Sequence, residues 1–243
     1  MDVPADRGDA RQAPMVRVTR IDGLPAALEV LALRRGRPVL VLVGGAAGMA
    51  DESRELLRAL LAEAVLPLLD RRGAAVVDGG TDSGVMQVIG RARAAAGHRF
   101  SLVGVAAEGT VDAGSGQGVP GGHAVALEPH HTHFVLVPGS AWGDESPWLG
   151  HVAEAIAGSG PVLTVVVNGG EITLDDVSRS LSRRRPVLVL AGTGRAADAI
   201  AGVHSKRATD PRAAAISASP LTCIVDVTDH AGVAAVLDEA LSR

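Results

Sequence analysis

Residues 75–93 read AVVDGGTDSGVMQVIGRAR, and this stretch decides the fold. Residues 75–77 are small or β-branched without polar alternation, which predicts a strand that is buried on both faces. Gly79 and Gly80 follow at once, where the chain turns sharply or lets a ligand come close. From Val85 the apolar positions keep helical spacing. The free N–H groups at such a helix start form a site for phosphate, although an ordinary strand-to-helix turn explains the glycines equally well.

The same order of strand, glycine turn and helix recurs along the chain. Apolar runs predict strands at 37–43, 101–107, 133–137, 161–167, 186–190 and 221–227, with a short edge strand at 16–19 as a further candidate. Helical spacing predicts helices at 24–35, 174–181 and 231–241. It also predicts a helix that begins at about residue 51 and is interrupted at Pro67, one that follows Trp148 and ends at about 157, and one that ends at 201. A long glycine-rich loop up to Gly122 is expected to be either mobile or a binding lid, and a surface loop is expected at 204–220. This alternation predicts an α/β fold, a Rossmann-like, doubly wound, mainly parallel sheet of about seven strands with helices on both faces.

Length and composition narrow the class of protein. With 243 residues, 47% of them hydrophobic, the chain is predicted to form one domain over 15–243, preceded by a disordered arm over 1–14. The net charge of −4 argues against binding to nucleic acid. No apolar run approaches the roughly 20 residues of a membrane span. The single cysteine, Cys223, and the polar N-terminus predict a cytoplasmic protein. The oligomeric state stays open, with a homodimer as one alternative.

Glycine-containing turns at the strand ends indicate a binding crevice. In a doubly wound sheet the carboxyl ends of the strands lie along one edge, so these turns are expected to line one crevice for a nucleotide-sized anionic ligand. The candidate ligand-binding residues are Gly44, Gly45, Gly79, Gly80, Thr81, Asp82, Ser83, Gly84, Glu108, His131, His133, Gly139, Ser140, Gly192, Thr193, Gly194 and Arg195.

One segment resembles a known dinucleotide pattern. Gly192-Thr-Gly-Arg-Ala-Ala197 fits G-x-G-x-x-G/A between a strand and a helix. The acidic residue that usually follows would have to be Asp226, which lies too far along the chain. A standard Rossmann NAD site is therefore not expected, whereas phosphate or ribose contacts from Thr193 and Arg195 are.

Histidines and acids supply two further hypotheses. His130, His131 and His133 suggest a metal site, but a zinc ion would need a further ligand, so no bound metal is predicted. Glu145 follows a predicted strand and stands beside Trp142. It is either a favourable acid at a helix N-terminus, a ribose ligand, or a general acid or base. Covalent catalysis has no support, because neither Ser83 nor Cys223 has an evident base partner.

Six motifs together resemble a known family. They are Val41-Leu-Val-Gly-Gly45, Asp78-Gly-Gly-Thr-Asp-Ser-Gly-Val-Met86, Gly104-Val-Ala, His131-Thr-His-Phe-Val-Leu-Val137, Val167-Asn-Gly-Gly170 and Ala191-Gly-Thr-Gly-Arg-Ala-Ala-Asp198. Over 37–201 the chain is similar to the SLOG domain at the N-terminus of TRPM cation channels, in its free-standing prokaryotic form, the LSDAT group. The resemblance implies a Rossmann-like domain that binds ADP-ribose or NAD-related molecules as a sensor or effector in nucleotide signalling. A ligand of this nucleotide type is expected, and no other cofactor is.

A second resemblance keeps an enzymatic alternative open. Lonely-guy phosphoribohydrolases, in the wider superfamily, pair a glycine turn leading into G-x-M with a P-G-G-x-G-T-x-x-E turn. The segment from Gly79 to Met86 resembles the first, and Pro138-Gly-Ser-Ala-Trp-Gly-Asp-Glu145 loosely resembles the second, with no Gly-Thr pair and the glutamate one position early. The alternative function is thus an N-glycosidase that acts on a nucleoside monophosphate or NAD derivative, with Glu145 as the catalytic residue.

Overall fold

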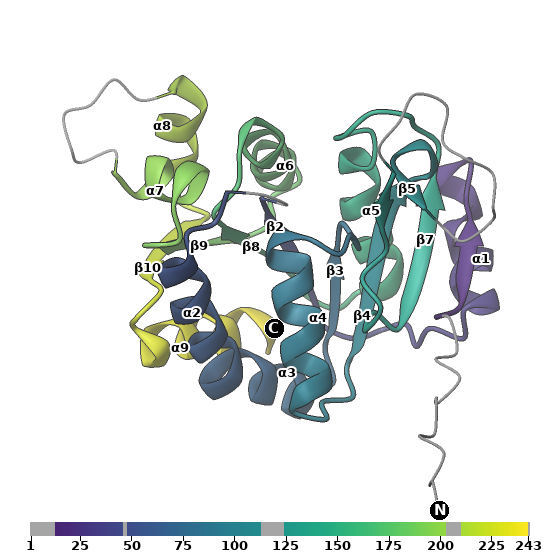
Figure 1. Cartoon of the computed structure of the whole chain (residues 1–243), viewed down its shortest axis with the longest axis horizontal. Coiled ribbons are helices and arrows are strands. Elements are labelled where there is room, and N and C mark those ends of the chain that lie inside the picture. Colours follow the sequence, from purple (N-terminus) through teal and green to yellow (C-terminus); the bar gives the residue numbers. More distant parts are fainter. Residues whose placement is uncertain (1–12, 46–47, 113–123, 203–209, 243) are drawn as a thin grey trace, which may run out of the picture.

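Eight parallel strands form one sheet in the residues that the computed structural model describes, which are 13–45, 48–112, 124–202 and 210–242 (Figure 1). In spatial order they are β1 (Met15–Arg17), β7 (His133–Val137), β4 (Ser101–Ala107), β3 (Ala75–Asp78), β2 (Val39–Gly44), β8 (Val162–Val167), β9 (Val187–Ala191) and β10 (Thr222–Asp226). A separate two-stranded sheet joins β5 (Val111–Asp112) to β6 (Val125–Ala126). The predicted fold class is confirmed, and the edge strand β1 completes the set of eight.

The order of the strands reverses between β2 and β8. From β2 the chain moves outward through β3, β4 and β7, and it then crosses back to add β8, β9 and β10 on the other side of β2. The connections that leave β2 and β8 run in opposite directions along the sheet. A crevice therefore opens above the carboxyl ends of these two strands. The topology therefore predicts the place of a ligand before any side chain is considered.

Helices cover both faces of the sheet. One face carries α2 (Asp51–Leu60), α3 (Leu66–Arg72), α4 (Gly84–Ala95) and α9 (His230–Leu241). The other carries α1 (Leu24–Val30), α5 (Ser146–Ala157), α6 (Glu171–Ser182), α7 (Arg195–Ala201) and α8 (Pro211–Ser217). Right-handed crossovers require this division, because connections that run in opposite directions along the sheet pass on opposite faces.

Strand β2 shows how the sequence builds two cores. Val39, Val41 and Val43 belong to the hydrophobic cluster on the α5–α6 face, whereas Leu40 and Leu42 belong to the cluster on the α2–α4 face. Alternate side chains of a strand point to opposite faces, so a strand that is covered twice must be apolar throughout. The unbroken apolar run of residues 39–43 follows from this requirement.

Three local elements differ from the sequence-based expectation. The predicted surface loop 204–220 contains helix α8, where Asp210 caps the Arg212 N–H (2.8 Å) and Pro211 begins the helix. Helix α1 ends at Val30 instead of 35, since Ala32 has a φ of +52°. The α-helix is interrupted just before Pro67 as expected, but by a turn of π-helix at Leu61–Val65, and Pro67 stands in the first turn of the continuing helix α3.

Two expectations fall mostly outside the described residues. They are the N-terminal arm, of which only residues 13 and 14 are described, and the part of the glycine-rich loop at 113–122. Within the part of the chain that the structure describes, no helix is both long and apolar enough to span a bilayer. The extent of the domain, 15–243, stays a prediction.

Candidate functional site

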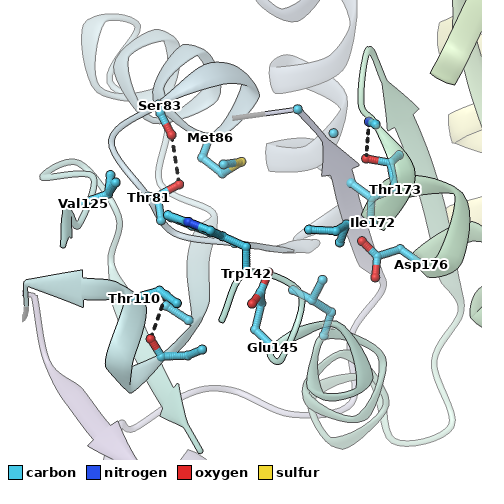
Figure 2. Close-up of a pocket in the computed structure, with 18 of the residues that line it drawn as sticks. Thr81, Ser83, Met86, Thr110, Val125, Trp142, Glu145, Ile172, Thr173 and Asp176 are labelled. Atoms are coloured by element: carbon cyan, nitrogen blue, oxygen red, sulfur yellow. Dashed lines mark hydrogen bonds between the residues drawn. The ribbon is translucent and has the colours of Figure 1, made fainter. Parts of the chain in front are cut away.

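A cavity of about 560 Å³ lies at the carboxyl ends of β2, β3 and β4, beside the point where the strand order reverses (Figure 2). Its walls come from separate segments of the chain. They are the glycine turns after β2 and β3, the start of α4, the loop before α5, the start of α6 and the first residue of α7. A cavity of this size accommodates a nucleotide-sized ligand.

The structure brings seven of the predicted site residues to this cavity. Those that line it are Gly44, Gly45, Gly79, Thr81, Ser83, Glu145 and Arg195. Those that do not line it are Gly80, Asp82, Gly84, Glu108, His131, His133, Gly139, Ser140, Gly192, Thr193 and Gly194. The ligand-binding roles of both groups stay predictions. Several residues of the second group form hydrogen bonds that order the segments lining the cavity.

The turn after β3 rests on a buried ionic cluster. His131 bridges two carboxylates, with Nε2 2.8 Å from Asp78 Oδ1 and Nδ1 2.8 Å from Glu128 Oε2, and all three side chains are fully buried. The Gly80 N–H donates to Asp78 Oδ1 (2.8 Å), and the Glu128 N–H donates to the Gly80 carbonyl (2.9 Å). The cluster therefore fixes the backbone of the turn from behind.

The two carboxylates keep His131 positively charged. Burial alone would lower the pKa of His131, but the charges and hydrogen bonds of Asp78 and Glu128 outweigh it and raise the pKa to about 9. Burial raises the pKa of Glu128, yet hydrogen bonds from His131 and His130 outweigh it, so the net direction is down. His131, predicted to contact a ligand, is a buried cation that pairs with the turn.

Most of the described backbone donors of this turn already have partners within the chain. The Gly80 N–H is held by Asp78, the Asp82 N–H donates to Ala126 O (2.8 Å), and the Ser83 N–H donates to Thr81 O (2.7 Å). The Val85 N–H, in the first turn of α4, donates to Gly45 O (3.4 Å). The phosphate cradle expected at this turn therefore has fewer N–H groups to offer than its sequence suggests.

A second set of buried hydrogen bonds orders the turn that leads into Arg195. Thr193 Oγ1 accepts from the Asn168 N–H (2.8 Å) and donates to Leu190 O (2.7 Å), while Asn168 Nδ2 donates to Thr193 O (2.7 Å). The Gly192 N–H donates to Asp198 Oδ1 (2.7 Å). These bonds tie the turn after β9 to the turn after β8, so Thr193 orders the wall without lining it.

Arg195 has a backbone conformation that is uncommon for its residue type. Its φ is +50°, in the left-handed region that mostly glycine adopts. A Cβ atom built on Gly170 would lie 3.0 Å from Arg195 Nη2, and one built on Gly48 would lie 3.4 Å from Nη1. The guanidinium thus lies against two glycines, where any larger residue would crowd it. A strained residue held in this way is typical of a functional site.

The loop before α5 brings an aromatic ring and an acid to the cavity. The Asp144 carboxylate accepts from the N–H groups of Ser140 (2.9 Å) and Ala141 (3.0 Å), which close the loop and lower the pKa of Asp144. Glu145 Oε2 accepts from the Gly143 N–H (3.0 Å). Trp142, at the tip of the loop, is 48% exposed and lies across the cavity above Glu145 (Figure 2).

Glu145 faces a second acid, Asp176 of α6. Burial raises the pKa of Glu145, and burial together with the nearby charge of Glu145 raises the pKa of Asp176 to about 7, against an opposing effect of Ser146. Asp176 Oδ1 and Ser146 Oγ are both buried, and neither has a hydrogen-bond partner of normal geometry among the described residues. Near neutral pH this part of the cavity therefore offers a carboxyl group that both gives and takes a proton.

Asp176 and its neighbours on α6 were missed by the sequence analysis. Gly170, Ile172, Thr173 and Asp176 all line the cavity. The Val167-Asn-Gly-Gly170 motif indicated a glycine turn here, but no pattern showed that the first turns of the next helix would line the cavity. The available signal in the sequence was an acid, Asp176, next to Val177 on the apolar side of a predicted helix that also buries Leu174.

Three further predicted residues that do not line the cavity contact other segments of the chain. Glu108 forms an exposed ion pair with Arg17 (2.5 Å). His133 opens β7, is half-buried and bonds through Nδ1 to Thr132 Oγ1 (2.7 Å). Gly139 accepts the Gly109 N–H (2.9 Å) and packs so tightly that an added Cβ would lie 2.4 Å from Asp144 Cβ. Over the described ranges, no group of three His, Cys, Asp or Glu side chains is placed to hold a metal ion.

Comparisons with known proteins agree with this architecture. The X-ray structure of TM1055 superposes with a TM-score of 0.53 over 84% of this chain and 99% of that one. Its sequence identity of 19% makes this a likeness of fold alone.

Sequence relatives are found among TRPM cation channels. The subfamily M member-like 2 channel of Nematostella vectensis is 27% identical over 198 residues, which is 67% of this chain and 13% of the channel. The subfamily M member 2 channel of Mus musculus is 26% identical over 207 residues, 68% of this chain and again 13% of the channel. The chain therefore spans only about an eighth of these relatives. A family model described as SLOG in TRPM, prokaryote, matches residues 37–235. The chain belongs to this prokaryotic family of SLOG domains.

Proposed function

We propose that the chain binds a nucleotide derivative of the ADP-ribose or NAD type in the cavity beside β2 and β8 and acts as a sensor or effector domain. The observation that carries the proposal is the placement of Arg195. It supplies the one basic side chain among the described residues that line the cavity, and its backbone is strained into position. A planar guanidinium held against glycine backbone suits the bidentate binding of a phosphate group.

The start of α6 adds to the attraction for an anion. Gly170 caps this twelve-residue helix without a side chain, and the cavity is lined by Gly170, Glu171, Ile172 and Thr173. The positive end of the helix dipole therefore lies at the same end of the cavity as Arg195. Gly44 and Gly45 also line the cavity with backbone atoms alone.

The proposal is tested with a panel of ligands. The purified chain is heated with ADP-ribose, NAD, AMP, nicotinamide mononucleotide and inorganic phosphate, and unfolding is followed. A ligand at about 100 times its Kd stabilises the folded state by roughly 2.7 kcal/mol. We expect at least one nucleotide to raise the Tm more than phosphate does. No shift with any nucleotide at millimolar concentration would contradict the proposal.

The carboxyl groups of Glu145 and Asp176 favour one second candidate, the hydrolysis of an N-glycosidic bond. Water would form a bond to C1′ of the ribose as the bond from C1′ to the base nitrogen breaks. One carboxylate would take the proton from water, and the protonated partner would give one to the departing base. Chromatography after prolonged incubation with AMP or NAD tests this: released base that disappears in Glu145→Gln supports hydrolysis, and its absence supports binding alone.

A further inference from the structure

The large sheet ends in two edge strands of different kinds. At one edge, β1 is three residues long, follows Pro14 and ends at Arg17, which pairs with Glu108. Short length, proline and charge are the usual devices that keep an edge strand from pairing with another chain. At the other edge, β10 is five residues long and contains no proline and no basic residue, with its single charge at its last residue, Asp226. The edge at β10 is therefore the less protected of the two.

Alternate residues of β10 turn their backbone groups away from β9. In a parallel pair, one residue gives both its N–H and its C=O to the neighbouring strand, and the next residue gives neither. The bonds that flank the strand, from the Val187 N–H to Leu221 O (2.8 Å) and from the Val227 N–H to Ala191 O (2.9 Å), place the odd-numbered residues on the β9 side. The residues that turn their backbone groups to the open edge are Thr222, Ile224 and Asp226.

Four of these outward backbone groups are unpaired. The Thr222 N–H donates to Ser219 O (3.0 Å), and Asp226 O accepts from the Asp229 N–H (3.0 Å). The others are the carbonyl of Thr222, the N–H and carbonyl of Ile224, and the N–H of Asp226, which form no hydrogen bond with the residues that the structure describes. Unpaired groups of this kind are a template for a further strand.

The four groups are complementary to a second copy of themselves. If two β10 strands pair antiparallel about a two-fold axis at Ile224, each Ile224 N–H donates to the Ile224 carbonyl of the other copy. Two residues away on either side, the Asp226 N–H of one copy meets the Thr222 carbonyl of the other. This register uses every unpaired group and leaves the bonds within each chain intact. A shift by two residues in either direction would leave unpaired groups in each copy.

The side chains of β10 suit the same register. Cys223 and Val225 pack against the cluster on the α2–α4 face, so Ile224 lies on the other face, where it is 37% exposed. Opposite residues of an antiparallel pair have Cβ atoms about 5.5 Å apart, so the two Ile224 side chains would cover each other. The two Asp226 carboxylates would lie at opposite ends of the pair, roughly 14 Å apart along the strands.

We infer that the chain pairs with a second copy of itself through β10, in a two-fold arrangement that joins the two large sheets into one. Such an interface is isologous, which is the commonest form of protein dimer. The inference is independent of the proposed function, because none of the described residues that line the cavity belongs to β10. Figure 1 shows β10 at the end of the molecule opposite α1.

Sedimentation velocity of the whole chain tests the inference. Between about 1 and about 200 μM we expect a monomer–dimer equilibrium. Ile224→Lys places two like charges beside the axis and should raise the dimer Kd at least about tenfold. Val30→Lys is the control, because Val30 is 77% exposed on α1, at the other end of the sheet, and its dimer Kd should equal that of the parent. A parent that stays monomeric, or a dimer that Ile224→Lys does not weaken, would overturn the inference.

A second variant separates the interface from the fold. Ile224→Pro removes an N–H that points away from β9, so the bonds between β9 and β10 remain, and it should also give a monomer. Circular dichroism and an unchanged Tm of the dilute protein show that both Ile224 variants are folded. A folded Ile224→Pro variant that dimerises like the parent would contradict the pairing.

Cross-linking tests the register. In a Cys223→Ser background, Ile224→Cys places two Cα atoms about 5.5 Å apart across the axis, within the range of a disulfide, whereas Asp226→Cys places them roughly 14 Å apart. Mild oxidation with copper phenanthroline should therefore give a covalent dimer of the first variant and leave the second monomeric on a non-reducing gel. Equal cross-linking of the two would overturn the two-fold axis at Ile224.

Discussion

The imidazole of His131 lies 2.8 Å from the Asp78 carboxylate at the end of β3, where no solvent reaches either group. This contact joins the strand to the turn that forms one wall of the cavity, because the same Asp78 oxygen accepts the Gly80 N–H. A protonated His131 also offsets part of the negative charge of Asp78 and Glu128. The wall is therefore held by a charged group that does not itself line the cavity.

Replacement of His131 should destabilise the fold rather than only weaken binding. His131→Asn leaves Asp78 and Glu128 buried without their cation, which costs about 3 kcal/mol or more. His230→Asn, at a surface pair with Glu63, should cost under about 1 kcal/mol. Urea denaturation at pH 7 measures both. Similar losses of unfolding free energy in the two variants would show that the buried cluster contributes no more to stability than a surface ion pair does.

The same contact predicts how stability depends on pH above neutrality. The pKa of His131 is raised to about 9 in the folded state from its ordinary value of 6.5, so its stabilising effect is complete below pH 6.5 and is lost as the pH rises through 9. The free energy of unfolding of the parent should fall over this window, whereas that of His131→Asn should change less. Parallel curves for the two proteins would contradict the role given to His131.

Gly80 should be intolerant of a side chain for a reason of packing. Its φ is +67°, and an added Cβ would lie 2.7 Å from Gly104 Cα. Gly73 has a similar φ of +59° with nothing within 4 Å of an added Cβ. Gly73→Ala is therefore expected to cost about 1 kcal/mol from backbone strain, and Gly80→Ala clearly more. Equal losses in urea denaturation would mean that the sheet absorbs the extra atom.

The fold was predictable from the sequence, but which of the candidate residues line the cavity was not. Unbroken apolar strands such as 39–43 and the glycines after them predict a parallel sheet and the edge of the sheet where the cavity lies. Gly80, His131 and Thr193 were expected at the cavity because they follow or precede strands, yet none of the three lines it. Which side of a turn faces the cavity depends on contacts with distant residues, such as Asp78 with His131, and spacing along the chain does not contain this information.

Asp176 lines the cavity, but its position in the sequence does not indicate this. In the sequence it is one acid in a helix that also carries Asp175, and only the folded structure buries it beside Glu145 and Ser146. Since burial raises the pKa of Asp176 from its ordinary value of 3.8 to about 7, the folded state binds the proton more tightly than the unfolded state, and stability falls as the pH rises between these values.

Removal of the Asp176 charge should therefore stabilise the unliganded protein at high pH. Asp176→Asn is expected to unfold at a higher urea concentration than the parent at pH 8 and at a similar one at pH 4. The groups that face Asp176 are Glu145 and Ser146 from the α5 end and Asp175 and Arg179 on α6, and none of them is altered in this variant. A lower stability than the parent at pH 8 would contradict the burial of an unpaired carboxylate.

Trp142 should report ligand binding by fluorescence. The chain has two tryptophans, and Trp148 packs against the core on the α5–α6 face. A ring that stacks on Trp142 should quench its emission, so Trp148→Phe should keep the ligand-dependent change and Trp142→Leu should lose it. A change that persists in Trp142→Leu would place the ligand away from this loop.

The most direct test of the central claim, that the cavity binds a nucleotide through Arg195, is calorimetric titration of the Arg195→Gln variant. The titrant is the nucleotide that stabilises the parent most, and the control is Arg58→Gln, on the far end of α2 and paired with Glu55. Loss of a charge-assisted contact with phosphate, worth about 1.5–3 kcal/mol, predicts a Kd at least about tenfold higher in Arg195→Gln and an unchanged Kd in Arg58→Gln. A folded Arg195→Gln variant that binds as tightly as the parent would contradict the account.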